Sequence, residues 1–326
     1  MIYWLIPYLV AYNASDAGNW KYGPEHVFKA EVRAIATSDE LSTMHLSADM
    51  YLACRPMNSS VIQCRVASAT IDNWSTEFDG TSSSEFHSPL PMRITDAVFH
   101  VKFNEDGVSK LWLTEPIERF KLDMLRAIFD TVHWGIDLSG QRYGRYDRVE
   151  KSMIGSCETT FDIGRRTPTK EEKNARKAIY GYSFAVPAFE GRTANKPFVI
   201  EKNRHVDRCS DQKLYLFESV DDKEFNEKHG LTKKTQVTSS RNRIYVGINR
   251  FSSYTRNIGT LEITSSRATS MRTFLNIDGF VHLSLETIRP AKEDIRQTGD
   301  SASAEGGFET GTAEPSEDAP AVTSFM

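Results

Sequence analysis

Short segments in which apolar and polar residues alternate recur along this chain of 326 residues, and this period of two constrains its fold more than any other feature. Alternation is typical of strands that bury one face. Residues 27–34 and 108–113 show it most clearly. Further candidate strands are residues 45–52, 61–66, 97–103, 146–163, 180–189, 198–202, 214–220, 243–248, 258–265 and 281–288. So many short strands predict a barrel or a sandwich.

One hairpin and one helix interrupt this pattern. Residues 104–107 read Asn-Glu-Asp-Gly between two candidate strands, and Gly107 tolerates the positive φ that a tight turn requires. Residues 119–134 instead repeat apolar side chains at steps of three and four, which predicts an amphipathic helix, and Gly135 suits its C-terminal end. A second, highly charged stretch at residues 165–177 is expected to form a short surface helix.

The two ends of the chain differ from this body. Residues 2–12 are apolar but too few to span a bilayer, and Ser15 and Ala17 suit the −3 and −1 positions of a cleavage site. We therefore expect a signal peptide over residues 1–17, although no Lys or Arg precedes the apolar run. A buried first strand of a cytosolic domain and a truncated gene model are the alternatives.

The C-terminal segment, residues 291–326, contains eight acidic and two basic residues and almost no large apolar ones. Such a composition buries too little surface to offset its ordering entropy, so we expect a disordered acidic tail. The folded domain then spans residues 18–290. No stretch after the N-terminal run is apolar enough to cross a membrane.

Four cysteines allow two disulfides in three connectivities, which fits a secreted protein. Cys54 and Cys64 flank a turn-like stretch, so a bridge across that hairpin is the simplest pairing, and it leaves Cys157 with Cys209. Zinc is a weak alternative, because no two cysteines have CxxC spacing and the histidines do not cluster. Asn58 and Asn73 begin glycosylation triplets that secretion would expose to modification.

Motifs of enzymatic chemistry are missing from the sequence. It has no GxSxG elbow, no HExxH pair and no Walker loop. His133 ends the predicted helix, where a structural histidine is the more common interpretation. We therefore expect no enzyme and no cofactor. Two basic segments remain, residues 165–177 and 202–208, and each is either a solvated face or a surface for an acidic partner.

Taken in order, several segments resemble the N-terminal domain of vitellogenin and its relatives, the large lipid transfer proteins. Residues 99–108 resemble the family's hairpin, and a tryptophan-containing stretch and a helix follow it, as in the family. Residues 155–161 resemble its Gly-x-Cys and Thr-x-aromatic pattern. The other segments that carry the resemblance are residues 20–23, 146–150, 200–209, 239–248 and 281–285.

This resemblance implies an antiparallel barrel closed around the helix, and a disulfide between Cys157 and Cys209. It also implies a receptor-binding role for Lys202, Arg204 and Arg208, because the matching segment of vitellogenins has been linked to receptor recognition. Position 203 is Asn where the family often has Thr. Family members continue for a thousand residues or more, whereas this sequence stops after the barrel.

The function expected from the sequence is that of a secreted, non-enzymatic binding module of the lipid transport family. A lipoprotein receptor or a polyanion is the expected partner, and no specific nucleic acid is. Two alternatives stay open: a lipid carrier in its own right, and the N-terminal fragment of a full-length vitellogenin. A helix inside the barrel leaves little room for lipid, which makes lipid transport by this chain alone doubtful.

Overall fold

The computed structural model describes most of the segment in which the sequence predicts strands. The described residues are 21–38, 43–58, 60–76, 90–137, 143–165, 198–212, 214, 230–246, 251–265, 272–292 and 304–307. The predicted signal peptide, the predicted surface helix after residue 165 and the candidate strand at residues 180–189 lie outside these residues.

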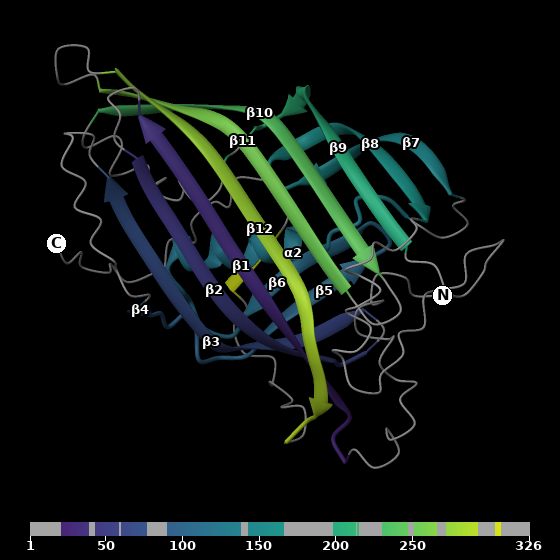
Figure 1. Ribbon diagram of the computed structural model, residues 1–326. Helices are drawn as coiled ribbons and strands as arrows, with labels where there is room; N and C mark the ends of the chain where they lie inside the picture. Colours follow the sequence, from purple (N-terminus) through teal and green to yellow (C-terminus); the bar gives the residue numbers. More distant parts are fainter. Residues whose placement is uncertain are drawn as a thin grey trace, which may run out of the picture.

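The described elements are strands with one helix among them (Figure 1). The strands of the first half are β1 (Pro24–Ser38), β2 (Thr43–Pro56), β3 (Val61–Thr76), β4 (Leu90–Pro91), β5 (Phe99–Asn104) and β6 (Gly107–Leu113). The helix α2 (Arg119–Asp130) follows. The remaining strands are β7 (Gly144–Ser152), β8 (Gly155–Arg165), β9 (Phe198–Ser210), β10 (Leu231–Val246), β11 (Phe251–Ser265), β12 (Arg272–Pro290) and β13 (Ala304–Gly307).

All strands belong to one antiparallel sheet, whose order is β13-β6-β5-β3-β2-β1-β12-β11-β10-β9-β8-β7, with β4 paired to β3. Figure 1 shows the sheet curling so that β5 and β6 lie on one side of α2 and β7 and β8 on the other. The mainly β fold wrapped around a central helix is confirmed. The predicted closure is wrong, because within the described residues β7 pairs only with β8 and the sheet stays open there.

The period of two in the sequence becomes the two faces of the sheet. In β1, Ala30, Val32 and Ala34 are buried on the face toward the helix, whereas Glu31 and Arg33 lie on the outward face. The same alternation continues across hydrogen-bonded neighbours, because residues in register share a face. The sheet therefore has a packed inner face and a polar outward face.

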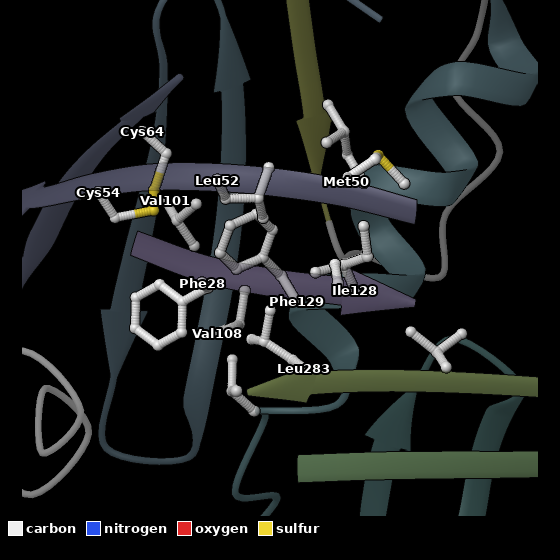
Figure 2. Packing of buried hydrophobic residues seen from close by; sticks show 14 of the residues in the cluster. Phe28, Met50, Leu52, Cys54, Cys64, Val101, Val108, Ile128, Phe129 and Leu283 are labelled. Carbon is white, nitrogen blue, oxygen red and sulfur yellow. A yellow bond between two sulfur atoms is a disulfide. The ribbon is translucent and has the colours of Figure 1, made fainter. Parts of the chain in front are cut away.

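The helix is held inside the curl by its apolar stripe. Met124, Leu125 and Ile128 are fully buried, and Phe129 packs edge-on against Phe99 of β5 with ring centroids 5.9 Å apart. Figure 2 shows side chains of the helix and of the sheet meeting in this core. Full burial of each large apolar side chain contributes roughly 1.5–3 kcal/mol, so the apolar stripe of the helix stabilises its position inside the sheet by several such contributions.

The helix ends earlier than its apolar pattern does. The sequence predicts helix as far as residue 134, but α2 ends at Asp130 and Thr131 caps it. Thr131 donates its hydroxyl to the Ile128 carbonyl at 2.6 Å. Val132 and Trp134 stay buried without being helical, because polar side chains from the sheet bind the main-chain carbonyls of this segment.

Several strands are longer than predicted. Strand β10 begins at Leu231 rather than at residue 243, and β12 begins at Arg272 rather than at residue 281. The residues added to β10, 231–242, are rich in Thr, Ser and Lys, which weakens the apolar signal of a strand. Those added to β12, 272–280, are more apolar but include Asn276, Asp278 and Gly279, which are uncommon in strands. Ala304–Gly307 of the segment predicted to be disordered pairs with β6. The remaining residues after 292 lie outside the described part, so their disorder stays a prediction.

Candidate functional site

A cluster of charged side chains lies between the end of α2 and strands β7 and β9. Glu150 of β7 accepts hydrogen bonds from Lys202 Nζ at 2.5 Å and from Arg204 Nε at 3.0 Å. All three side chains are removed from solvent. Lys202 and Arg204 occupy alternate positions of β9, so both point inward, on the face that also carries buried Ile200.

This cluster also fixes the end of the helix. Lys202 Nζ donates to the His133 carbonyl at 2.8 Å, and Arg204 Nη2 lies 3.8 Å from Asp130 Oδ2. Asn242 Nδ2 donates to the Thr131 carbonyl at 3.0 Å. Cations and donors suit this place because a helix C-terminus carries partial negative charge and unpaired carbonyls.

Two carboxylates and two cations make the cluster electrically neutral. Burial pushes the pKa of the Glu150 carboxyl up, but Arg204 and Lys202 together outweigh it and hold that pKa well below its ordinary value. Burial lowers the pKa of the Lys202 ammonium, and Glu150 opposes that shift. Burial also lowers the pKa of His133, which keeps its imidazole neutral. The charged groups of the cluster therefore neutralise one another inside the protein, and none of them is available to a partner.

The receptor-binding role expected for Lys202 and Arg204 is therefore corrected. A buried side chain cannot present its charge to a docking protein, and both of these are satisfied by groups of the same chain. Arg208 is different, because its side chain is 60% exposed. It binds both oxygens of Glu158 at 2.8 and 2.9 Å, so its charge is already paired on the surface.

Both disulfides that the sequence suggests are present. Cys54 pairs with Cys64 between β2 and β3, and Cys157 pairs with Cys209 between β8 and β9. Their sulfur–sulfur bonds join residues that face each other in register, with Cα atoms 4.1 and 4.0 Å apart. All four cysteines are thus committed to the rigid sheet.

The two glycosylation candidates lie in different settings. Asn58 is exposed in the turn between β2 and β3, where its Oδ1 accepts from the backbone amides of Ser60 and Val61 at 2.8 and 2.9 Å. Its amide nitrogen is not used in those bonds. Asn73 lies within β3, in register with Leu46 of β2. Modification at either position stays a prediction.

The described residues lack two further kinds of functional feature, a metal-binding cluster and a membrane-spanning helix. None of them form a group of three or more His, Cys, Asp or Glu that could hold a metal ion. In the same part of the chain, no helix combines the length and apolar character needed to cross a membrane. His133 is buried with its carbonyl bound by Lys202, which is a structural environment.

The outward face of strands β7 to β11 carries a hollow of about 410 Å³. Three arginines border it, namely Arg145, Arg241 and Arg243. Arg243 Nε lies 3.1 Å from Glu201 Oε1, whereas Arg145 and Arg241 make no ion pair with any described residue. The other lining residues are Thr160, Asp162, Glu201, Lys202, Asn203, Asn242 and Tyr254.

Registry explains why these side chains gather. Arg145 pairs with Asp162, which pairs with Glu201, which pairs with Arg243, so this row crosses four neighbouring strands on one face. Sequence reasoning missed this surface because its residues come from separate strands. One signal was available: Arg241 and Arg243 alternate in a strand, and alternate residues share a face.

Comparison with known proteins identifies the fold. No protein-family model matches the chain, and no curated protein sequence does. A solved structure that reports lipid–protein interactions in lipovitellin matches 89% of this chain with a TM-score of 0.52 and 12% sequence identity. The outer membrane protein OprG from Pseudomonas aeruginosa matches with a TM-score of only 0.17, which supports no inference.

The chain spans 28% of the lipovitellin chain that it matches. At this level of identity the likeness concerns the fold alone. The curled antiparallel sheet around a central helix is therefore a lipovitellin-like fold.

Proposed function

We propose that this chain is a secreted, non-enzymatic binding module of the vitellogenin-like lipid transport family, and that it binds a receptor or a lipoprotein through the outward face of its sheet. The observation that carries the proposal is the division of the sheet into two faces. The inner face is filled by α2 and the buried ion cluster, whereas the outward face has a hollow bordered by two arginines, Arg145 and Arg241, that form no ion pair with a described residue.

The cavity between α2 and the sheet is too small for a lipid. The cavity between α2 and the sheet, lined in part by Ala34, Ala127 and Val281, has a volume of about 40 Å³. Ligand pockets in proteins usually measure roughly 300–1,000 Å³. A lipid that entered this cavity would therefore have to displace the helix, and with it the contacts of Phe129 and the Glu150 cluster.

Secretion is supported by the two disulfides. Disulfides persist in oxidising compartments and are rare in the reducing cytosol. The intact mass of protein released by a eukaryotic secretory host tests this part. It should report loss of residues 1–17, two disulfides and any glycan at Asn58 or Asn73.

Partner capture tests the binding role. The secreted chain is immobilised and exposed to lipoprotein particles and to the soluble ectodomain of a lipoprotein receptor. Capture should fall when Arg145→Glu and Arg241→Glu are combined, because both exposed charges at the hollow are then reversed. A matched control combines Arg93→Glu with Arg119→Glu, two exposed arginines at other places in the fold.

Two outcomes would contradict the proposal. Equal capture by the hollow variant and by the control would remove the outward face as the binding surface. Lipid co-purifying at a stoichiometric level would instead favour the alternative of a lipid carrier.

A further inference from the structure

We infer that the hollow on the outward face of β7 to β11 binds an anionic saccharide, a sugar chain that carries carboxylate or sulfate groups. This inference rests on the proposed function, because it takes the outward face as the binding surface. It adds the chemistry of the ligand and the residues that recognise each of its groups.

The first step is the unpaired positive charge. Arg145 and Arg241 are exposed and make no ion pair with any residue that the structure describes. Arg241 also stands directly opposite Arg256 in the register of β10 and β11. Arg256 is neutralised by both oxygens of Asp278, at 3.0 and 2.6 Å, whereas no described carboxylate pairs with Arg241 in this way.

Because Asp278 already neutralises Arg256, Arg241 is the member of this opposed pair whose charge is left for an anion to bind. A guanidinium presents parallel N–H donors that match the two oxygens of a carboxylate or sulfate. The hollow is therefore prepared for an anionic group at the Arg241 side and for a second one at Arg145.

The second step is the mixed floor of the hollow. Asp162 and Glu201 lie between the arginines, together with Thr160 and Asn203. These carboxylates would repel an anionic group placed directly over them, so the anionic groups of a ligand are confined to the arginine sides of the hollow. The same carboxylates accept hydrogen bonds from hydroxyl groups, which a sugar chain provides between its anionic groups.

The third step is an aromatic surface at one side of the hollow. Tyr254 lines it, and the rings of Tyr254 and Phe280 lie 6.1 Å apart on neighbouring strands. Aromatic rings supply large, rigid contact area with a polar tip on tyrosine. The face of a sugar ring can pack on such a surface, whereas an acidic peptide needs no aromatic ring for its binding.

The size of the hollow agrees with this ligand. Its volume of about 410 Å³ lies within the usual range for small-molecule sites. Arg145 and Arg241 stand three strand spacings apart and two residues out of register, which at roughly 4.8 Å per spacing and roughly 3.4 Å per residue is about 16 Å. A ligand must therefore extend across the strands to reach both, as a chain of several sugar rings would.

Calorimetric titration of the purified full chain tests the inference. The probe is a hexasaccharide of alternating uronic acid and sulfated glucosamine. The wild type should bind it, and Arg145→Gln combined with Arg241→Gln should weaken binding at least about tenfold, because two charge-assisted contacts are lost. Tyr254→Ala should weaken it separately. Arg93→Gln combined with Arg119→Gln, the matched control, should bind as the wild type does.

Three results would overturn the inference. They are no binding of the hexasaccharide by the wild type, equal binding by the arginine variant and its control, and equally tight binding of a glutamate hexapeptide. The last result would assign the hollow to acidic polypeptides. Failure of the saccharide test can be distinguished from failure of the proposed function. In the first case the wild type would still capture lipoprotein or receptor although it bound no saccharide.

Thermal unfolding shows whether a variant that loses binding is still folded. The arginine side chains are exposed, so the double variant should melt within a few degrees of the wild type. Loss of binding with an unchanged melting temperature supports the inference. If the variants that lose binding also lose their fold, the Tyr254→Phe variant provides the comparison. That variant keeps the ring and the fold and should retain binding.

Discussion

Arg204 of β9 donates from Nε and Nη2 to the two carboxylate oxygens of Glu150 in β7, each at 3.0 Å, with both side chains buried. Strand β8 lies between them in the sheet, so this pair joins strands that share no backbone hydrogen bonds. A buried ion pair adds little net stability, because desolvation offsets its Coulomb energy. We infer that its main effect is to fix the open edge of the sheet against the end of α2.

Removing the charge of Glu150 should destabilise the fold strongly. Glu150→Gln leaves Lys202 and Arg204 buried with only the more distant Asp130 carboxylate to balance them. Breaking a buried pair from one side costs about 3–5 kcal/mol. Urea unfolding followed by circular dichroism measures this loss.

The control for this change is Glu158→Gln. Glu158 pairs with Arg208 on the surface, where both side chains are partly exposed to water. Exposed pairs contribute at most about 1 kcal/mol, so this variant should unfold almost as the wild type does. Equal losses in the two variants would show that the buried cluster has no special role.

The sequence predicted the strands and the helix because both produce regular apolar periods. The hairpin at Asn104–Gly107 follows the predicted turn, with Gly107 at φ +117°. Both disulfides also follow the suggested pairing. Closure of the sheet could not be predicted, because it depends on whether β7 meets a partner, and no local pattern in β7 records that.

The receptor-binding role predicted for the basic segment at residues 202–208 was wrong for Lys202 and Arg204, and the reason is physical. A run of basic residues in a strand does not make one face, because neighbouring side chains point to opposite sides. Lys202 and Arg204 share the parity of buried Ile200, whereas Asn203 lies outward. The carboxylate that neutralises them comes from β7, about fifty residues earlier, and only the fold brings it near.

Gly135 should be irreplaceable for reasons of space as well as backbone conformation. Its φ is +76°, and a Cβ there would stand 2.6 Å from Glu150 Oε1. Gly135→Ala should therefore combine the strain of a left-handed alanine, about 1–2 kcal/mol, with overpacking of about 1–3 kcal/mol. Thermal unfolding of the variant measures the sum.

Gly23 provides a matched comparison, since its φ is +74° and nothing lies within 4 Å of the position of its Cβ. Gly23→Ala should show the backbone strain alone. If the two alanine variants had the same melting temperature, the close approach of Gly135 to Glu150 would contribute nothing to stability.

The two disulfides should differ in their effect on stability. The Cys157–Cys209 bond spans 52 residues and the Cys54–Cys64 bond spans 10. Chain-entropy estimates give about 4 and about 2.7 kcal/mol for loops of these lengths, because a longer loop restricts the unfolded chain more. Replacing each pair by alanine and measuring unfolding in urea tests the order. A larger loss for the Cys54–Cys64 pair would contradict the entropic account.

Acid should destabilise the fold through His26. This histidine lies in β1, in register with Cys54, and is fully buried beside the Phe28 ring. Burial lowers the pKa of its imidazole to about 4. The unfolded chain, in which a histidine has a pKa near about 6.5, therefore binds the proton more readily. Stability that is present at neutral pH is lost as the pH falls from about 6.5 towards about 4.

These two pKa values determine the size of the effect. Between about pH 7.5 and about pH 5, His26 should reduce the free energy of unfolding by about 2 kcal/mol. Glu150 adds little in this interval, because the stability that its lowered pKa contributes is lost only as the pH falls through the ordinary carboxyl pKa of about 4.3 and below. In His26→Gln the side chain stays neutral at every pH, so the difference in unfolding free energy between the two pH values should shrink by that amount. An unchanged difference would mean that another buried group, such as His133, is responsible for the acid sensitivity.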